Sequence, residues 1–572
     1  MISFRRTKLI RGKRWWIVFF AIAGASMLLS EGLITPAISV SSAVEGLRII
    51  YPDIKTLPIV IIILLTLFSV QKFGTNVVGG LFGVMMLIWF SMIGFFGFLS
   101  ILDHPEIFKA INPVYAIEFL TLYPGGFWIL GAVFLCTTGA EALYSDLGHC
   151  DRRSIRLGWI FVKICLLLNY FGQGAWLLES IGGEISQEVN PFYSIIPQMF
   201  LLPAIAVATF AAIIASQALI SGSFSLISEA TRLNLWPKLR TLYPTTKKGQ
   251  IYIPAINFAL CVGCIGITYY FKESSNMEAA YGLAVVTAMI NTTILFILYL
   301  SCQKVSKFII YSFAATYLTI EGSFLIANLA KFIHGGWIVF LGGFLIFSTM
   351  WIWYQAKIFK RRHTKYTDFY EVLPLLIDIS KDKSIPKIST HLVYMTSSAY
   401  VDEIETKIMY SLLERQPKRA DIYWFVHVEI VDEPYVCNYK ATIISQEDAV
   451  RVDFKLGFRV EPRISLLLQK VMAKLISNKE IGFNSDYSYK GKHNVLGDVS
   501  FVILKKFIAN QHYLPLYQRC IINIYHLINR LSISEEQAFG VDDEPNSVII
   551  EQVPIIFKSP VKNLIKLNRI YE

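Results

Sequence analysis

Charged residues are scarce in this chain, and their scarcity is the first constraint on its fold. Only 17% of the 572 residues are Asp, Glu, Lys or Arg, whereas 54% are hydrophobic and 14% are aromatic. About a quarter of an average soluble sequence is charged. Much of this chain is therefore expected to lie in lipid.

Sequence motifs of several protein classes are also missing. The chain has neither a G-x-x-x-x-G-K-[ST] loop nor a G-x-G-x-x-G loop, which argues against an ATP-driven pump and against a dinucleotide-dependent enzyme. It has no TVGYG-type selectivity loop. The one C-x-x-C pair, Cys261 and Cys264, lies in an apolar run without a second ligand pair, so helix packing is favoured over zinc or redox chemistry. We therefore expect no enzyme activity, no cofactor and no transition metal.

Long apolar runs are what the sequence has in abundance. A bilayer-spanning helix takes about 20 residues. Ten runs are predicted to span: 15–46, 57–71, 77–101, 127–144, 157–178, 203–228, 251–271, 279–300, 309–330 and 335–356. The first run is long enough for a helix plus an unwound or kinked piece, which Pro36 within it favours.

The net charge of +11 comes from short basic clusters between these runs. Lysine and arginine accumulate before the first run and in alternate loops, and cytoplasmic loops carry such an excess. The alternation predicts a multi-pass protein of the cytoplasmic (inner) membrane with both termini in the cytoplasm. Nucleic acid is not expected as a partner, because the basic residues form no extended patch.

The pattern changes near residue 358. Charge density rises, and β-rich runs at 420–431 and 547–557 accompany a helical piece at 462–476. The predicted organisation is a basic cytoplasmic N-terminus (1–14), a transmembrane domain of about ten helices (15–357) and a cytoplasmic α/β domain (358–572).

Carboxylates inside the apolar runs are the main candidates for function. A charge at the bilayer centre costs several kcal/mol, roughly 2.5–3.5 on insertion scales, so it usually faces a pathway. Glu31 and Thr35 lie at i and i+4 on one helix face. Pro36 cannot bond the carbonyl of Gly32. Carboxylate, hydroxyl and carbonyl oxygens together would suit a dehydrated cation.

A second pair repeats this chemistry. Thr138 and Glu141 lie at i and i+3, and Gly139 between them is expected to let another backbone approach. For each of these glutamates the alternative is a structural hydrogen bond at a helix interface. Glu45 and Tyr144 are further candidates for the pathway, and Glu45 could instead lie near the outer surface.

Other polar groups in the runs have weaker claims. Gln217 and Ser221 belong to a stripe with Ser225 and Ser228 on one helix face, where helix-helix contacts are the favoured interpretation over ion contact. Gln173 and Tyr281 are expected to face a bundle interior, with packing as an equal alternative. Gly79 and Gly83 have the spacing of a close helix contact.

Several motifs together resemble the KUP/HAK/KT potassium uptake permeases. They are GLITPAISVSSAVEGL (32–47), FGTNVVGGLFG (73–83), TGAEALYSDLGH (138–149), NYFGQGA (169–175), IASQALISGSFS (214–225), GQIYIPAIN (249–257) and HGGW (334–337). PKRADIYWFVHVEIVDEPY (417–435) and FKLGFRVEPR (454–463) are similar to the family's bacterial members.

The resemblance implies potassium uptake coupled to proton entry, on a LeuT/APC-type helical bundle followed by a cytosolic domain. By motif position it places the family's ion-site carboxylate and threonine on Glu31 and Thr35, and a second pair on Thr138 and Glu141. Glu31 stands where an aspartate is common in the family. The substitution lengthens the side chain and keeps its charge.

One departure concerns the start of the chain. Family members begin with two further helices, the first with a GDxGTSPLY-like motif that helps to hold the ion, and the first span here already matches the third helix. Either Met1 is an internal methionine of a longer reading frame, which we favour, or the chain is a degenerate or partnered transporter.

The leading hypothesis is secondary active K⁺ uptake by K⁺/H⁺ symport, with Glu31 or Glu141 as carrier of the coupling proton. The alternatives are a LeuT-type carrier of amino acids or polyamines and a non-transporting membrane scaffold or sensor. The α/β domain is expected to regulate transport. As partners we consider the bilayer, a second copy in a homodimer and a small regulatory nucleotide at this domain.

Overall fold

The computed structural model describes most of the chain from residue 14 to residue 555. The gaps are 74–75, 140–150, 180–188, 245–250, 304, 363–365, 482–496, 509–513 and 542–547, with short ones at 399, 432, 434, 446–447, 458–459, 461, 479, 535–536 and 538. The chain forms two compact units, one mainly of residues up to Trp351 and one mainly of Ile352–Glu572. We describe each unit by itself.

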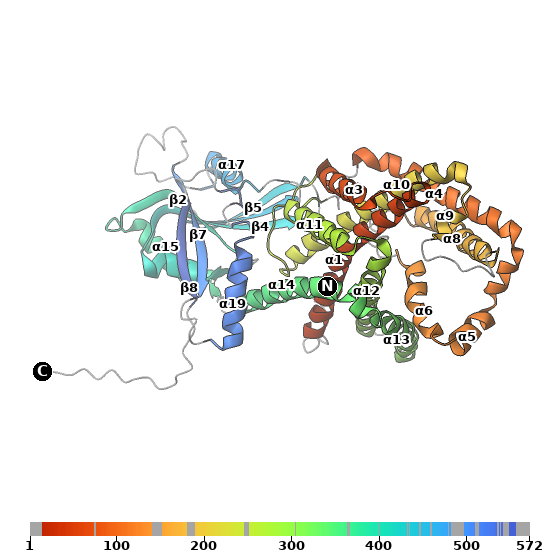
Figure 1. The fold of residues 1–572 in the computed structure, drawn as a ribbon. Coiled ribbons are helices and arrows are strands. Elements are labelled where there is room, and N and C mark those ends of the chain that lie inside the picture. The colour runs from red at the N-terminus through yellow and green to blue at the C-terminus, as the bar shows by residue number, and fades with distance from the viewer. Residues whose placement is uncertain are drawn as a thin grey trace. The chain divides into compact units, whose positions relative to one another are not determined.

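The first unit is helical (Figure 1). Its long helices are α1 (Arg14–Glu45), α3 (Thr56–Val70), α4 (Asn76–Asp103), α8 (Arg152–Glu179), α10 (Gln198–Arg232), α11 (Pro254–Phe271), α12 (Ser274–Cys302), α13 (Lys307–Leu329) and α14 (Trp337–Arg362). Shorter pieces are α2 (Leu47–Ile50), η3 (Gln71–Phe73), η4 (Pro105–Ile111), α5 (Pro113–Leu122), α6 (Gly126–Val133), η5 (Phe134–Thr137), α9 (Pro191–Ser194) and η7 (Phe332–Gly336).

Nine of the predicted spans are confirmed as helices. Within the described ranges, nine helices are long and apolar enough to cross a bilayer. The remaining prediction, 127–144, coincides with α6 and η5, which end at Thr137, and residues 140–150 lie outside the described part. A helical protein that crosses the membrane many times is thus established.

Of the unwound or kinked piece expected in the first run, the unwound alternative is wrong. α1 stays helical from Arg14 to Glu45 with Pro36 inside it. It packs against α3, α10, α11 and α12. Because neighbours on several sides support it, the helix tolerates the hydrogen bond that Pro36 cannot make.

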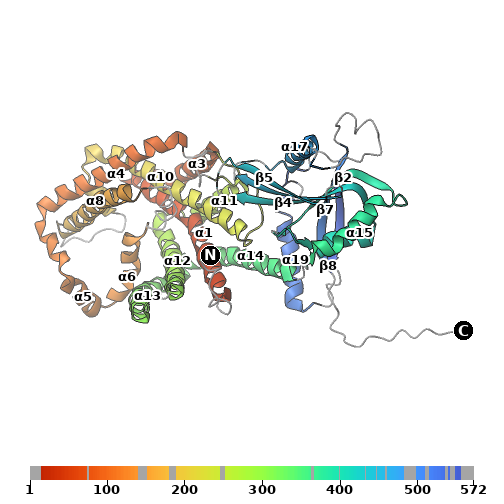
Figure 2. The same cartoon turned by 180° about the vertical axis from the view of Figure 1, so that it is seen from behind.

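Glycine contacts bring α4 and α8 together. The two helices run side by side in both views (Figures 1 and 2). A Cβ on Gly97 would lie 2.5 Å from the carbonyl oxygen of Leu168, and one on Gly172 would lie 2.5 Å from Gly97. The close contact expected at Gly83 is wrong, because a Cβ there would meet nothing within 4 Å. The surroundings of Gly79 lie outside the described part.

The second unit is built on a six-stranded sheet in the order β5-β6-β4-β2-β7-β8. The strands are β2 (Lys387–Met395), β4 (Arg419–Val431), β5 (Cys437–Ser445), β6 (Ala449–Gly457), β7 (Val499–Ile508) and β8 (Val548–Ile555). All pairs are parallel except the edge pair of β5 and β6. The predicted α/β domain and its β-rich runs at 420–431 and 547–557 are confirmed.

Helices and a small two-stranded sheet complete this unit. They are β1 (Tyr366–Asp368), α15 (Phe369–Lys381), β3 (Glu403–Glu405), α16 (Thr406–Met409), η8 (Tyr410–Arg415), α17 (Ile464–Ser477) and α19 (Leu516–Asn529). α17 confirms the helical piece predicted at 462–476. The end of α14 from Ile352 onward belongs to this unit, where Trp353 and Ala356 pack against Tyr525 of α19.

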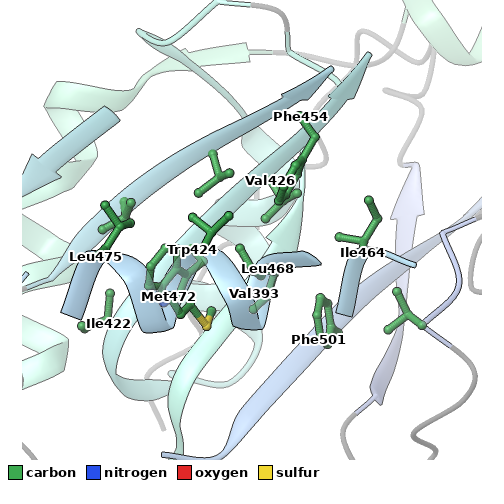
Figure 3. Close-up of a cluster of buried hydrophobic side chains, with 14 of the residues drawn as sticks. Val393, Ile422, Trp424, Val426, Phe454, Ile464, Leu468, Met472, Leu475 and Phe501 are labelled. Atoms are coloured by element: carbon green, nitrogen blue, oxygen red, sulfur yellow. The ribbon is translucent and has the colours of Figure 1, made fainter. Parts of the chain in front are cut away.

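The apolar run 422–426 at the centre of β4 is buried on both faces of the sheet. Trp424 and Val426 face one core, where Leu468 and Met472 of α17 cover them (Figure 3). Tyr423 and Phe425, which alternate with them, face a second core with α15. Since a parallel sheet is covered on both faces, both sets of side chains are apolar.

Candidate functional site

Glu31 is the most deeply buried carboxylate of α1. Its exposed fraction is 0%, and Thr35 lies one helical turn further on, where its hydroxyl is also buried. Both residues belong to a helix whose spanning window is apolar. The predicted pairing of a carboxylate and a hydroxyl on one turn therefore lies inside the helical unit.

Two helices pack closely against this turn. A Cβ on Gly32 would lie 2.9 Å from the hydroxyl of Ser223 on α10. The carbonyl of Gly32 accepts the thiol of Cys264 on α11, with 3.8 Å between sulfur and oxygen. That carbonyl was expected to be freed by Pro36 for a cation, and here it already has a protein partner. Cys264 thus acts in helix packing, and the described residues hold no cluster of metal ligands.

Thr138 follows the end of a helix. η5 ends at Thr137, Thr138 is extended and Gly139 has a φ of +108°. A Cβ on Gly139 would meet nothing within 4 Å, so the backbone angle and not a close approach requires glycine here. Glu141 and Tyr144, the other candidates of this segment, lie outside the described residues.

Tyr281 of α12 bonds to Thr138 and packs next to a core that includes residues of α1. Its hydroxyl donates to the hydroxyl of Thr138 at 3.2 Å, and that of Thr138 donates to the carbonyl of Leu135 at 2.8 Å. Tyr281 also packs against the cluster that contains Ile34 and Ala37 of α1. One side chain therefore bonds to the helix end at Thr138 and borders the core of α1.

The weaker candidates are placed as follows. Glu45 accepts the backbone N–H of Ser274 at 2.8 Å and the hydroxyl of Ser274 at 2.5 Å, at the first residue of α12. Gln173 donates to Asn169 at 2.6 Å on α8. Gln217 is buried and Ser221 is half-buried on α10. Glu45 and Gln173 thus have structural hydrogen bonds, and a contact of any of the four with an ion stays a prediction.

One buried carboxylate was missed from the sequence. Glu321 of α13 is 4% exposed and accepts the hydroxyl of Thr293 on α12 at 2.7 Å. The signal was available, because Glu321 is an acidic residue inside an apolar run. Glu321 was passed over because it lies in none of the family motifs and has no threonine three or four residues away, unlike Glu31 and Glu141.

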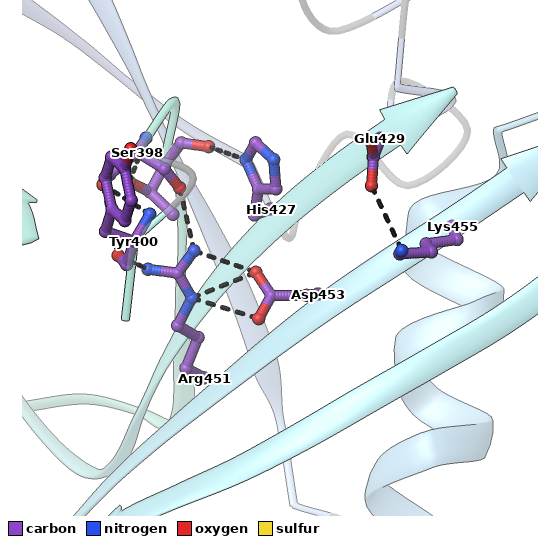
Figure 4. A network of polar contacts seen from close by, with 8 residues as sticks. Ser398, Tyr400, His427, Glu429, Arg451, Asp453 and Lys455 are labelled. Carbon is purple, nitrogen blue, oxygen red and sulfur yellow. Dashed lines mark hydrogen bonds and ion pairs between the residues drawn. The ribbon is translucent and has the colours of Figure 1, made fainter. Parts of the chain in front are cut away.

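In the second unit, a polar network holds the loop that follows β2. Arg451 of β6 donates to the carbonyls of Ser398, at 2.8 Å, and of Tyr400, and it pairs with Asp453 at 2.9 Å (Figure 4). Arg451 is almost fully buried. The network fixes this loop at the carboxyl end of the parallel strands, where such sheets bind ligands.

Comparison with known families identifies the chain. The family model of the K⁺ potassium transporter integral membrane domain matches residues 2–358, and that of the K⁺ potassium transporter C-terminal domain matches residues 389–555. The chain belongs to the potassium transporter family. The two family models correspond to the two units of the structure, since one covers the membrane helices and the other covers the sheet from β2 to β8.

Relatives at high identity agree. The probable potassium transport system protein Kup of Flavobacterium psychrophilum is 50% identical over 98% of this chain and 86% of its own length. The Kup protein of Clostridium perfringens strain SM101 is 42% identical over 96% of this chain and 86% of its own length. The Kup 1 protein of Lactococcus lactis strain IL1403 is 40% identical over 99% of this chain and 85% of its own length.

These findings confirm the resemblance to the KUP/HAK/KT permeases. The protein is a potassium transporter and not an enzyme, and it is a multi-pass protein of the inner membrane. The comparisons lend no support to an amino acid or polyamine carrier or to a non-transporting scaffold. The bundle type, the orientation of the termini, proton coupling, homodimerisation and nucleotide binding stay predictions.

Proposed function

We propose that this transporter takes up K⁺ by symport with H⁺ on a LeuT/APC-type helical bundle. Glu31, Thr35, Thr138 and Glu141 form the ion site in this proposal. The observation that carries it is Glu31, fully buried one turn from Thr35 in a spanning helix. A buried carboxylate beside a hydroxyl favours a cation as the transported species.

The helix end at Thr138 supports the same arrangement. Broken helices line the substrate sites of LeuT-type transporters, where unwound carbonyls coordinate the cation. The hydrogen bond from Tyr281 holds Thr138 at this helix end. The sequence contains no phosphate loop, so ion gradients are the proposed source of energy.

The test is Rb⁺ uptake by the protein in a host without its own potassium uptake systems, at several imposed pH gradients. Uptake that grows with an inward proton gradient supports symport, and uptake that ignores the gradient contradicts it. Glu31→Gln should reduce uptake by at least about tenfold while insertion is unchanged, since the amide keeps shape and loses the charge.

Thr35 has a matched pair of variants. Thr35→Val should raise the KM for K⁺ if its hydroxyl contacts the ion, and Thr35→Ser should restore it. An unchanged KM in the valine variant would assign Thr35 to packing.

The second unit is proposed to regulate transport through a small nucleotide. Starting from β2, the parallel strands β4 and β6 follow on one side of the sheet, and β7 and β8 follow on the other side. Ligands of such sheets bind where this order reverses, at the carboxyl ends of the strands. The loop that Arg451 holds lies at the end of β2, beside that point.

A further inference from the structure

Glu321 lies deep in a helix that exposes most of its surface. It stands fourteen residues after Lys307 and eight before Leu329 in α13, which places it about 21 Å and about 12 Å from the two ends. Ile310, Glu321, Ala327 and Asn328 are the buried residues of this helix. The carboxylate thus belongs to the narrow face that α13 turns toward the other helices.

Thr293 holds one oxygen of this carboxylate. Its hydroxyl donates to Oε1 of Glu321 at 2.7 Å. The other oxygen, Oε2, is buried and has no hydrogen-bond partner among the described residues. An unpaired charge is costly in such a setting, and Oε2 is the oxygen that has room for a proton or a cation.

The other charged residues of α12 and α13 lie far along these helices from this group. α12 and α13 pack on each other and on α1, α6, α11 and η7. Of their described charged side chains, Glu278 pairs with Lys331 at 3.2 Å, fifteen residues before Thr293 on α12, and Lys307 begins α13. On α1, Glu31 is buried, Glu45 is bound to Ser274 and Arg14 begins the helix.

Neutral titratable groups complete the surroundings. α6 has none. The described tyrosines and cysteines on the other elements are Tyr281, Tyr299 and Cys302 of α12, Tyr311 and Tyr317 of α13, and Cys261, Cys264, Tyr269 and Tyr270 of α11. The side chain of His334 in η7 lies outside the described part. No described basic side chain forms an ion pair with Glu321, so a proton or a transported cation must neutralise it.

The same face of α13 leads to the proposed ion site. Phe324 and Leu325, one turn beyond Glu321, pack in the same cluster as Phe134 and Tyr281, next to the helix end at Thr138. Asn328, a further turn on, lies against Gly282, where an added Cβ would come within 2.4 Å of the Oδ1 of Asn328. A change of position at Glu321 can therefore reach this helix end through packed side chains.

We propose that Glu321, held by Thr293, is a proton-binding site that carries the coupling H⁺. The inference rests on the proposed symport and assigns the two ions to separate carboxylates. K⁺ is held at Glu31, while Oε2 of Glu321 takes up H⁺ from the outer side and releases it to the cytoplasm. Charge balances at each step, since the carboxylate becomes a neutral acid and is then restored.

The experiment uses the full chain in liposomes that contain a pH-sensitive dye, with Rb⁺ as the tracer. One unit of inward pH gradient should raise Rb⁺ accumulation by the native protein about tenfold, if one proton moves with each ion. Glu321→Gln should still exchange Rb⁺ across the membrane. It should lose the stimulation of Rb⁺ accumulation by the pH gradient, and Rb⁺ uptake should no longer acidify the liposome interior. Glu321→Asp should keep part of the stimulation, because it retains an acid.

Two neighbouring threonines supply a matched control. Thr293→Val removes the hydroxyl from Glu321 and should shift the pH at which Rb⁺ uptake is half-maximal. Thr292 is exposed and bonds only the carbonyl of Ala288 on its own helix, at 3.0 Å. Thr292→Val should behave as the native protein.

The outcomes separate this inference from the proposed function. If native uptake ignores the pH gradient, the symport itself is wrong. If native uptake responds and Glu321→Gln responds equally, Glu321 is not the proton site. A folded Glu321→Gln that also loses Rb⁺ exchange would place Glu321 in the potassium pathway and overturn the inference. If Glu321→Gln does not fold, infrared spectra supply the test. The native protein must then show the band of a protonated carboxyl group, and this band must shift in Thr293→Val. The absence of the band or of the shift would overturn the inference.

Discussion

Three glutamates of the apolar segments have three different environments. Glu31 is enclosed by helices next to a threonine. Glu45 binds the first residue of α12 with both oxygens. Glu321 has one oxygen held by Thr293 and one without a hydrogen-bond partner among the described residues. The hydrogen bonds around each carboxylate, and not its presence in an apolar run, separate a structural role from an ionic one.

His526 gives the second unit a pH dependence of stability. Burial and the nearby ammonium of Lys360 hold the pKa of His526 below its usual 6.5. Between that lowered pKa and 6.5 the unfolded chain binds more protons than the folded one, so stability falls as the pH drops through this window.

His526→Gln should therefore lose less Tm than the native protein between about pH 7 and about pH 5. Lys360→Met should reduce this loss of Tm only in part, because it removes the ammonium charge near His526 but leaves the burial of His526 unchanged. The measurement is thermal unfolding of the solubilised protein across this pH range. An equal loss of Tm in native protein and His526→Gln would contradict the assignment.

Among the elements, the crossing of α4 and α8 depends on the absence of side chains. Gly97 and Gly172 face each other there with backbone atoms in contact range. Small residues at such a crossing let two membrane helices approach, and dispersion contacts between them then replace lipid contacts.

Gly97→Ala is expected to destabilise the protein by about 1–3 kcal/mol, since the added methyl group would overlap the backbone of α8. Gly83→Ala is the matched control on the same helix, because a Cβ there has open space. Thermal unfolding in detergent compares the two. Equal stability of the variants would show that α4 and α8 can separate without cost.

For the whole molecule, the division into two units predicts separable tasks. The described spanning helices, up to Trp351 of α14, and all proposed ion ligands belong to the first unit, and the second unit has its own sheet and two hydrophobic cores.

Deletion of residues 366–572 should change the rate of uptake or its control and leave ion selectivity intact. The measurement is Rb⁺ uptake with K⁺, Rb⁺ and Cs⁺ as competitors, before and after the deletion. A changed order of competition would place part of the second unit in the ion pathway.

Local sequence was sufficient for the long apolar helices and for some elements of the second unit. Nine spanning helices follow from apolar runs of sufficient length, because a helix in lipid satisfies its backbone within one segment. β4 likewise follows from its own residues, since β-branched and aromatic side chains suit a strand that is buried on both faces. Glu31 and Thr35 were found because one helical turn places them together.

Tertiary structure alone decided which side chains meet. The bond of Tyr281 to Thr138, the bond of Glu45 to Ser274 and that of Thr293 to Glu321 join residues 143, 229 and 28 positions apart. The face that a membrane helix turns inward is not marked by hydrophobicity, because its lipid-facing and bundle-facing residues are both apolar. For that reason the sequence by itself determined the spanning helices, the strands β4 and β8 and the family, whereas packing decided that α13 turns Glu321 toward Thr293.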